Sequence, residues 1–262
     1  MKNIKNVTLL VSSCKDYTSL LDNFFIQFKK HFPEFDGDIV INTFYDDKRY
    51  NSISKKYDEY SWSCRTKKAL SLVKTPYILI LMDDYYLKSN VDSSLFSNFV
   101  ELLSNNKRIG YLKLYEHNKH IIKLNKEYYN KYFFNEGKRV KFSISLQAGL
   151  WKKTYLNKVL RRGEDAWVFE RNGSYRSYYY HELKLTLDVD NFMLFDYFGG
   201  SLVKRGLFSQ DVVDYYVKNE GLNFDNIVVY KKEEIKSKKF FLKKIYERVY
   251  LPLSIFFKIK YR

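Results

Sequence analysis

The chain has 262 residues, and its 46 lysines and arginines against 30 aspartates and glutamates give a formal net charge of +16. A hydrophobic content of 45% excludes an intrinsically disordered chain, and 10 glycines with 3 prolines exclude a fibrous or low-complexity one. Two cysteines, Cys14 and Cys64, are too few for a disulfide-stapled scaffold or a four-cysteine zinc site, which favours a reducing compartment.

The excess positive charge indicates an anionic partner, which from composition alone is a nucleic acid, an anionic lipid or a phosphorylated substrate. Coding DNA rich in A and T would also enrich Lys, Asn, Tyr, Phe and Ile, so the composition does not choose among them. No apolar run reaches the roughly 20 residues of a membrane span. The short run at 7–13 predicts a buried first strand rather than a signal sequence.

The first part of the chain alternates apolar runs with segments of helical spacing. The predicted elements are a strand at 7–13, a helix at 20–32, a strand at 38–42, a loop at 44–60, a helix capped by Ser63 and ending before 75, and a strand at 77–82. This β-α-β-α-β order gives a parallel sheet with right-handed crossovers.

The second part predicts further helices and strands around a basic, tyrosine-rich segment at 115–142. The elements are a helix at 92–103, a strand at 109–114, a helix at 152–160, a short helix from Glu164, a strand at 191–197 and a helix at 209–219. We therefore expect one α/β domain over 1–230, followed by a tail at 231–262.

The tail carries half of the net charge, with eleven Lys and Arg against three Glu. Its apolar and aromatic residues fall at helical spacing among the lysines, which is typical of a helix that binds an anionic membrane surface. Packing on the domain as a final core helix, or binding nucleic acid, remains an alternative.

Two acids, Asp83 and Asp84, follow directly after the apolar strand at 77–82. Ligands bind at the carboxyl ends of strands in open α/β sheets, so an acid here is a candidate ligand for a metal. Mg²⁺ typically uses one or two carboxylates plus phosphate oxygens, so one protein carboxylate would suffice beside a diphosphate. The alternative is a pair of acids at an ordinary junction of strand and turn.

Residues 61–65 stand at a predicted helix N-terminus, which is a favourable place for an anion. The helix dipole favours an acid in the first turn, so the positive charge of Arg65 there indicates an external anion. The alternative is a capped helix in which Trp62 is a hydrophobic anchor.

A third candidate is the run 161–167, where Glu164 and Asp165 follow two arginines. One of the two acids could act as a general base that deprotonates an acceptor hydroxyl, while the arginines neutralise a departing diphosphate. Acids in the first turn of a helix are also ordinary without any such function.

Together and in this order, these motifs resemble bacterial GT-A-type glycosyltransferases that are found with polysaccharide gene sets. The likeness covers about residues 7–206 and leaves the tail outside. The stretches that carry it are 13–17, 24–33, 62–70, 77–85, 145–153 and 163–170.

The resemblance implies a GT-A (Rossmann-like) α/β fold, with a mostly parallel sheet flanked by helices. It also implies a nucleotide-sugar donor, such as a UDP-sugar, held by Mn²⁺ or Mg²⁺. Asp84 matches the metal-binding acid, and Asp83 stands where a second acid commonly precedes it. Glu164 and Asp165 match the acid pair that supplies the base in inverting members, with Asp165 preferred.

The resemblance also implies a set of residues that hold the nucleotide, of which Arg65 matches a donor-phosphate residue. The set is Arg65, Trp62, Ser12, Ser13, Asp16 and Asp83, with Asp84 as the metal ligand. Two departures from the family pattern concern this set and the metal. Lys15 and Asp16 reverse the expected order of an acidic and then a basic residue, and Tyr85 follows Asp83 and Asp84 where a further acid would complete an Asp-Xaa-Asp.

The sequence therefore predicts a metal-dependent, inverting glycosyltransferase that acts on a glycan or lipid-linked glycan in the cytoplasm, peripherally on the membrane. A sugar nucleotidylyltransferase is an alternative, although the Gly-rich basic loop expected after its first strand is missing. A nucleic-acid-binding protein is the other alternative. We expect no nucleic-acid partner, because such a protein needs stacking aromatics on exposed strands, whereas these strands are predicted to be buried.

Overall fold

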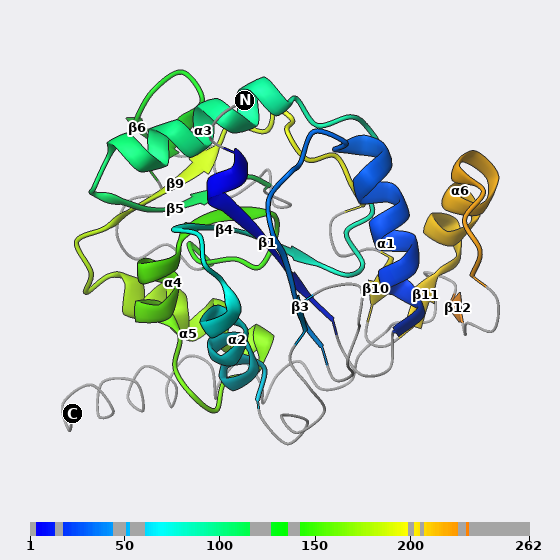
Figure 1. Cartoon of the computed structure of the whole chain (residues 1–262), viewed down its shortest axis with the longest axis horizontal. Helices are drawn as coiled ribbons and strands as arrows, with labels where there is room; N and C mark the ends of the chain where they lie inside the picture. Colours follow the sequence, from blue (N-terminus) through cyan, green and yellow to red (C-terminus); the bar gives the residue numbers. More distant parts are fainter. Residues whose placement is uncertain are drawn as a thin grey trace, which may run out of the picture.

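The structure is a computed structural model that describes residues 4–13, 18–43, 51–52, 61–115, 127–135, 142–198, 202–204, 207–224 and 229–230. The described residues form a mixed sheet of nine strands, with helices packed on both of its faces (Figure 1). A small three-stranded sheet and helix α6 (Gln210–Glu220) lie to one side. The predicted α/β fold, a sheet flanked by helices, is confirmed.

The first half of the described chain builds the parallel part of the sheet. Its elements are η1 (Ile4–Asn6), β1 (Val7–Ser12), α1 (Thr18–His31), β2 (Ile39–Asn42), β3 (Asn51–Ser52), α2 (Trp62–Leu72) and β4 (Tyr77–Met82). Strand β1 is central, because Leu9 pairs in parallel with Ile39 of β2 and with Leu79 of β4. Every residue of β1 is buried, as expected for a strand covered on both faces.

The second half adds strands of both directions. Its elements are α3 (Ser93–Asn105), β5 (Ile109–Lys113), β6 (Glu127–Tyr128), β7 (Phe133–Asn135), β8 (Gly149–Lys152), α4 (Lys153–Val159), α5 (Ala166–Ser177), β9 (Leu183–Leu187), β10 (Val203–Lys204), β11 (Leu207–Ser209), α6 and β12 (Val229–Tyr230). The order across the large sheet is β3-β2-β1-β4-β8-β5-β9-β7-β6.

Strand β8 determines which loop reaches the end of β4. It lies between β4 and β5 and is antiparallel to both, with Leu150 opposite Leu79 on one side and Leu112 on the other. Because β8 runs in the opposite direction, its first residues and the loop before them lie beside the carboxyl end of β4. Residues 143–148 are thereby brought to the edge where Asp83 follows β4.

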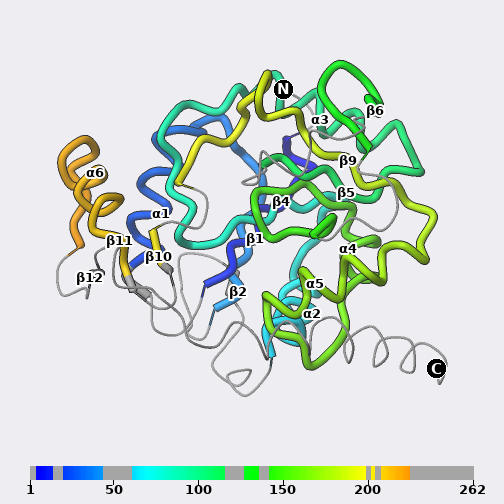
Figure 2. Tube along the Cα trace, turned by 180° about the vertical axis from the view of Figure 1, so that it is seen from behind, coloured from blue at the N-terminus to red at the C-terminus, as the bar shows by residue number. Residues whose placement is uncertain are grey.

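Helices cover both faces of the sheet (Figures 1 and 2), and a hydrophobic cluster fills the space on each face. Helices α1 and α3 contribute Phe24 and Phe96 to the larger cluster. Helices α2, α4 and α5 contribute Leu70, Leu156 and Phe169 to the other. The helices that carry the candidate site, α2 and α5, therefore belong to the same face.

The prediction of a strand at 191–197 is wrong. The strand of this region is β9, which pairs with β5 and β7. After β9 the chain turns, because the N–H groups of Asn191 and Phe192 donate to the carbonyl oxygen of Asp188 at 3.1 and 2.8 Å. Leu194, Phe195 and Tyr197 are buried in an irregular segment instead, whereas Met193 is 51% exposed.

Within the described ranges, no helix has both the length and the apolar character needed to cross a membrane. The predicted tail at 231–262 lies outside the described residues. The same holds for Asp16 and for most of the predicted loop at 44–60, of which only β3 is described.

Replacing Phe24 by alanine should lower the free energy of unfolding by about 3–5 kcal/mol, because a buried ring is lost from a packed cluster. Phe24 is fully buried, and its ring centroid lies 5.2 Å from that of Phe25 and 5.9 Å from that of Phe28. The matched control is Ile26→Ala on the same helix, since Ile26 is 53% exposed. Urea denaturation followed by circular dichroism measures both, and equal losses would contradict this packing of α1.

Candidate active site

The carboxyl ends of β1 and β4 lie side by side at one edge of the sheet. Ser12 pairs with Met82, and the N–H of Asp83 donates to the carbonyl oxygen of Ser12 at 3.1 Å. Asp83 is buried, whereas Asp84 is half-buried. Both acids therefore stand at the edge where α/β sheets bind their ligands.

The environment of Asp84 disfavours its negative charge. Burial raises the pKa of the Asp84 carboxyl to about 7, although its own N–H and that of Val203 donate to it and act in the opposite direction. Val203 begins β10, so the small sheet touches the end of β4. A carboxylate in such surroundings is stabilised by a nearby cation.

Three tyrosine rings stack beside these acids. The ring of Tyr85 lies 4.6 Å from that of Tyr197, which in turn lies 4.3 Å from that of Tyr115. Burial raises the pKa of Tyr85 well above its usual value, and negative charges that include those of Asp84 and Glu170 raise it further. Carboxylates from β4 and from α5 thus lie around one buried ring.

Helix α2 begins before the residue that the sequence indicated. Its N-cap is Ser61, whose Oγ accepts the N–H of Cys64 at 3.4 Å, so the prediction of Ser63 as the cap is wrong. Ser63 lies in the first turn, where its Oγ accepts the N–H of Glu164 at 3.0 Å and its own N–H donates to the carbonyl oxygen of Glu164 at 3.0 Å. The N–H groups of Ser63 and Cys64 therefore have partners within the protein, which leaves less of this helix end for an anion.

Trp62 connects the strand ends to α5. Its indole N–H donates to Ser12 Oγ at 2.8 Å, and its ring packs against Phe169 with centroids 5.0 Å apart. Only 7% of the side chain is exposed. Trp62 thus has the contacts of a buried anchor between two elements.

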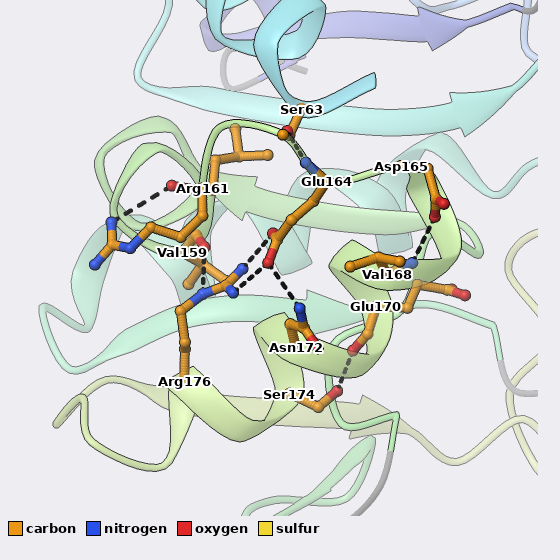
Figure 3. A network of polar contacts seen from close by, with 12 residues as sticks. Ser63, Val159, Arg161, Glu164, Asp165, Val168, Glu170, Asn172, Ser174 and Arg176 are labelled. Carbon is orange, nitrogen blue, oxygen red and sulfur yellow. Dashed lines mark hydrogen bonds and ion pairs between the residues drawn. The ribbon is translucent and has the colours of Figure 1, made fainter. Parts of the chain in front are cut away.

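Glu164 and Asp165 point in different directions (Figure 3). The carboxylate of Glu164 accepts two hydrogen bonds from the Arg176 guanidinium, at 2.5 and 2.7 Å, and one from the Asn172 amide at 3.0 Å. Glu164 and Arg176 are both buried. Both carboxylate oxygens of Glu164 are therefore occupied by hydrogen bonds within the protein.

Asp165 is exposed and caps α5. Its Oδ1 accepts the N–H of Val168 at 2.7 Å, and the helix begins at Ala166. The preceding Gly163 has φ +85°, a left-handed conformation that favours glycine and lets the chain turn into the helix. The acid pair therefore stands at the start of a helix as predicted, but only the second acid is at the surface.

A third acid, Glu170, received no role from the sequence. Its Oε1 accepts the hydroxyl of Ser145 at 3.0 Å and the N–H of Leu146 at 2.7 Å. Both partners belong to the loop before β8, which lies beside the end of β4. The sequence signal was its place in the resembling stretch at 163–170, but no local pattern shows that residues 145–146 reach it.

Hydrogen bonds connect the segments that carry most of the predicted site residues, because Ser12 bonds to Asp83 and Trp62, and Ser63 bonds to Glu164. The N–H of Ser13 donates to the carbonyl oxygen of Asn42 at 2.9 Å, which extends the pairing of β1 with β2. Arg65 is buried in the first turns of α2, with 7% exposed. The segments connected in this way carry Ser12, Ser13, Trp62, Arg65, Asp83, Asp84, Glu164 and Asp165.

The described part of the chain has no group of three or more His, Cys, Asp or Glu side chains arranged to hold a metal ion. Asp84, with Asp83 next to it, offers carboxylate oxygens, which are the ligands that Mg²⁺ and Mn²⁺ prefer. These residues fit a cation that takes one or two protein carboxylates and completes its coordination with phosphate oxygens.

Comparisons with known proteins found distant similarities in structure but none in sequence families or among curated proteins. No family model matches this chain, and no curated protein does. A cytidylyltransferase from Leptospira borgpetersenii is 14% identical with a TM-score of 0.35, and the match covers 59% of this chain and 63% of that one. TarS from S. aureus is 10% identical with a TM-score of 0.45, over 69% of this chain and 57% of that one.

An active-site mutant of LgtC is 10% identical with a TM-score of 0.33, and the match covers 84% of this chain and 80% of that one. This chain spans less than two thirds of the length of the cytidylyltransferase and of TarS. At these identities and scores, the likenesses carry no argument about activity.

Replacing Arg176 by methionine should lower the free energy of unfolding by about 3–5 kcal/mol, because it leaves the charge of Glu164 buried without its partner. The double variant with Glu164→Gln removes both charges and should recover much of this loss. The control is Lys158→Met, which breaks a more exposed pair with Glu182 and should cost at most about 1 kcal/mol. Urea denaturation at pH 7 measures all three variants, and an Arg176→Met loss as small as the control would contradict the importance of the buried pair.

Proposed function

We propose that this chain is a metal-dependent glycosyltransferase that moves a sugar, with inversion, from a nucleotide-sugar donor to a hydroxyl of a glycan or lipid-linked glycan. The proposed setting is cell-surface polysaccharide synthesis at the inner face of the cytoplasmic membrane. One observation carries the proposal. The end of β1 pairs with the end of β4 and is bonded to the start of α2, which is bonded in turn to the loop before α5, so the segments that carry the proposed residues are connected.

The donor diphosphate is proposed to bind at this edge, with Asp84 and Asp83 facing a divalent cation. The cation would supply positive charge next to the diphosphate oxygens. The raised pKa of Asp84 supports this assignment, because a carboxylate that burial disfavours is stabilised by bound positive charge. Arg65 is the proposed protein cation on the donor phosphates.

The nucleotide is proposed to lie over Ser12 and Ser13 at the end of β1, and Asp16, which follows them in the sequence, remains a further candidate. Trp62 takes a different part in this proposal. Because its ring is buried against Phe169 and its N–H is bonded to Ser12, it holds the floor of the nucleotide site in place.

The proposed general base is Asp165. Asp165 is exposed, whereas Glu164 is buried in its pair with Arg176, and this contrast supports the second acid over the first. Asp165 would accept the proton of the acceptor hydroxyl while the hydroxyl oxygen bonds to the anomeric carbon. The bond from that carbon to the diphosphate oxygen breaks, and the nucleoside diphosphate leaves with the electron pair.

Binding of the donor should be detectable without knowing the acceptor. In a thermal-shift screen of UDP, GDP, CDP and TDP with and without Mn²⁺, we expect one nucleotide to raise the Tm in a metal-dependent way. Ligand at 100 times its Kd stabilises a protein by about 2.7 kcal/mol. Asp84→Ala should abolish the metal-dependent part of the shift. The control is Asp36→Ala, which removes an exposed acid and should leave the metal-dependent shift intact. A full metal-dependent shift in Asp84→Ala would rule out Asp84 as a ligand.

Asp165→Asn should reduce release of the nucleoside diphosphate by about 10²–10⁴-fold, because the amide does not accept the proton. Stability should hardly change, since Asn is as good an N-cap as Asp. The matched control is Asp92→Asn, the same substitution at the N-cap of α3, where the N–H of Leu95 donates to Asp92 at 2.9 Å. Unchanged turnover in Asp165→Asn would remove Asp165 as the base, and release of pyrophosphate instead would indicate a nucleotidylyltransferase.

A further inference from the structure

Gln147 lies just before β8, at the edge of the sheet where two acids follow β4. The carbonyl oxygen of Ala148 accepts the N–H of Leu114 at 2.8 Å, so the pairing of β8 with β5 continues to Ala148. Gln147 is the next residue toward the edge, and it is half-buried. Because β8 is antiparallel to β4, the residues before β8 and those after β4 share one edge of the sheet. Gln147 therefore lies at the same edge as Asp83 and Asp84.

The backbone of Gln147 is held by a chain of hydrogen bonds that starts on α5. Its N–H donates to Ser145 Oγ at 3.2 Å, and the Ser145 hydroxyl donates to Glu170 Oε1 at 3.0 Å. The same carboxylate oxygen accepts the N–H of Leu146 at 2.7 Å. Glu170 thus ties residues 145–147 to a helix, which fixes the place from which the Gln147 side chain starts.

The oxygen of the Gln147 side chain is held by Tyr197. The Tyr197 hydroxyl accepts the N–H of Ala148 at 2.9 Å and donates to Gln147 Oε1 at 3.0 Å. Tyr197 is buried, and its ring is stacked between those of Tyr85 and Tyr115. A buried hydroxyl needs an acceptor for its hydrogen, and this need assigns the oxygen of the amide, rather than its nitrogen, to Tyr197. The NH₂ group is the branch of the amide that is left.

The NH₂ group of Gln147 has no hydrogen-bond partner within the part of the chain that the structure describes. It is also not one of the buried polar atoms that lack a partner, so solvent reaches it. The backbone N–H and the side-chain oxygen of the same residue are both bonded. Two N–H donors on a fixed amide are therefore preorganised for an acceptor that comes from outside the protein.

The charge at this edge favours one kind of acceptor. Burial raises the pKa of Tyr197 well above its usual value, and the charges of other groups, including that of Asp84, raise it further. The charge of Asp84 therefore acts on the hydroxyl that holds Gln147. A sugar hydroxyl accepts from an amide and also donates to a carboxylate, whereas a phosphate oxygen only accepts and needs a cation beside the acids.

We propose that Gln147 binds a hydroxyl of the donor's sugar through its NH₂ group, and that Tyr197 is the positioning residue that directs this group. This inference rests on the proposed function, in which the donor diphosphate binds at Asp84 and the sugar attached to it lies along the same edge. The contact adds to the affinity for the sugar nucleotide and leaves the affinity for the free nucleoside diphosphate unchanged.

The test compares free nucleoside diphosphates with sugar nucleotides by titration calorimetry of the full chain with Mn²⁺. The probes are UDP, GDP, CDP and TDP, and UDP-glucose, UDP-galactose, UDP-N-acetylglucosamine, GDP-mannose, CDP-glucose and TDP-glucose. Gln147→Met keeps the length of the side chain and removes the NH₂ group. It should weaken binding of a sugar nucleotide about three- to tenfold, the effect of one hydrogen bond, and leave the Kd of the free nucleoside diphosphate unchanged. The matched control is Gln210→Met on α6, where the amide donates to Asp214 at 2.6 Å, and it should change neither Kd.

Tyr197→Phe tests the positioning role. It keeps the stacked ring and removes only the hydroxyl that bonds to Gln147. We expect weaker binding of the sugar nucleotide with an unchanged Kd for the free nucleoside diphosphate, because a purely structural role would affect both alike. In the Gln147→Met background, Tyr197→Phe should add no further selective loss, since the amide that it directs is gone. A selective loss in Gln147→Met but not in Tyr197→Phe would refute the positioning role.

The same titrations separate this inference from the proposed function. If Gln147→Met leaves the binding of every sugar nucleotide unchanged, or weakens the free nucleoside diphosphate equally, the inference is wrong and the transferase proposal stands. The inference is also wrong if the unmodified chain binds a free nucleoside diphosphate but no sugar nucleotide. If none of the probes binds the unmodified chain, the proposed function fails and the inference fails with it.

Discussion

The arrangement of the site depends on the contact between the start of α2 and the loop before α5. The hydroxyls of Ser61 and Ser63 accept the N–H groups of Gly163 and Glu164 at 3.1 and 3.0 Å, and the N–H of Ser63 donates back to the carbonyl oxygen of Glu164. Buried backbone groups of a loop and of a helix end both need partners, and here each segment supplies those of the other. Two motifs about a hundred residues apart are joined in this way.

A buried ion pair fixes the same loop from its other side. Charges removed from water must be offset by close and well-directed partners, and Glu164 receives three hydrogen bonds from Arg176 and Asn172. Holding Glu164 inward leaves Asp165 and Trp167 at the surface. Two adjacent acids of the same charge thus acquire different surroundings, and only Asp165 is exposed to solvent.

The elements near the N-terminus were predictable because their signals are local. The continuous apolar runs of β1 and β4 are what a strand covered on both faces requires, and the spacing of the phenylalanines predicted α1. The caps were less predictable. Asp92 caps α3 as expected, but Ser61 replaces Ser63 at α2, because the hydroxyl of Ser63 bonds to the N–H of Glu164 in a distant segment. The prediction of a strand at 191–197 was wrong because an apolar run does not by itself distinguish a strand from an irregular segment that is partly buried.

The sequence by itself determined the α/β class, the parallel opening and the position of Asp83 and Asp84 after a buried strand, since periodicity and order along the chain are sufficient for these. Only the tertiary structure decided which of Glu164 and Asp165 is buried, that Trp62 packs inward while Trp167 faces solvent, and that Glu170 reaches the loop beside β4. These outcomes depend on contacts between segments that are distant in sequence. Such contacts leave no periodic signal in the chain, because they are set by the direction of β8 and by the packing of α2 against α5.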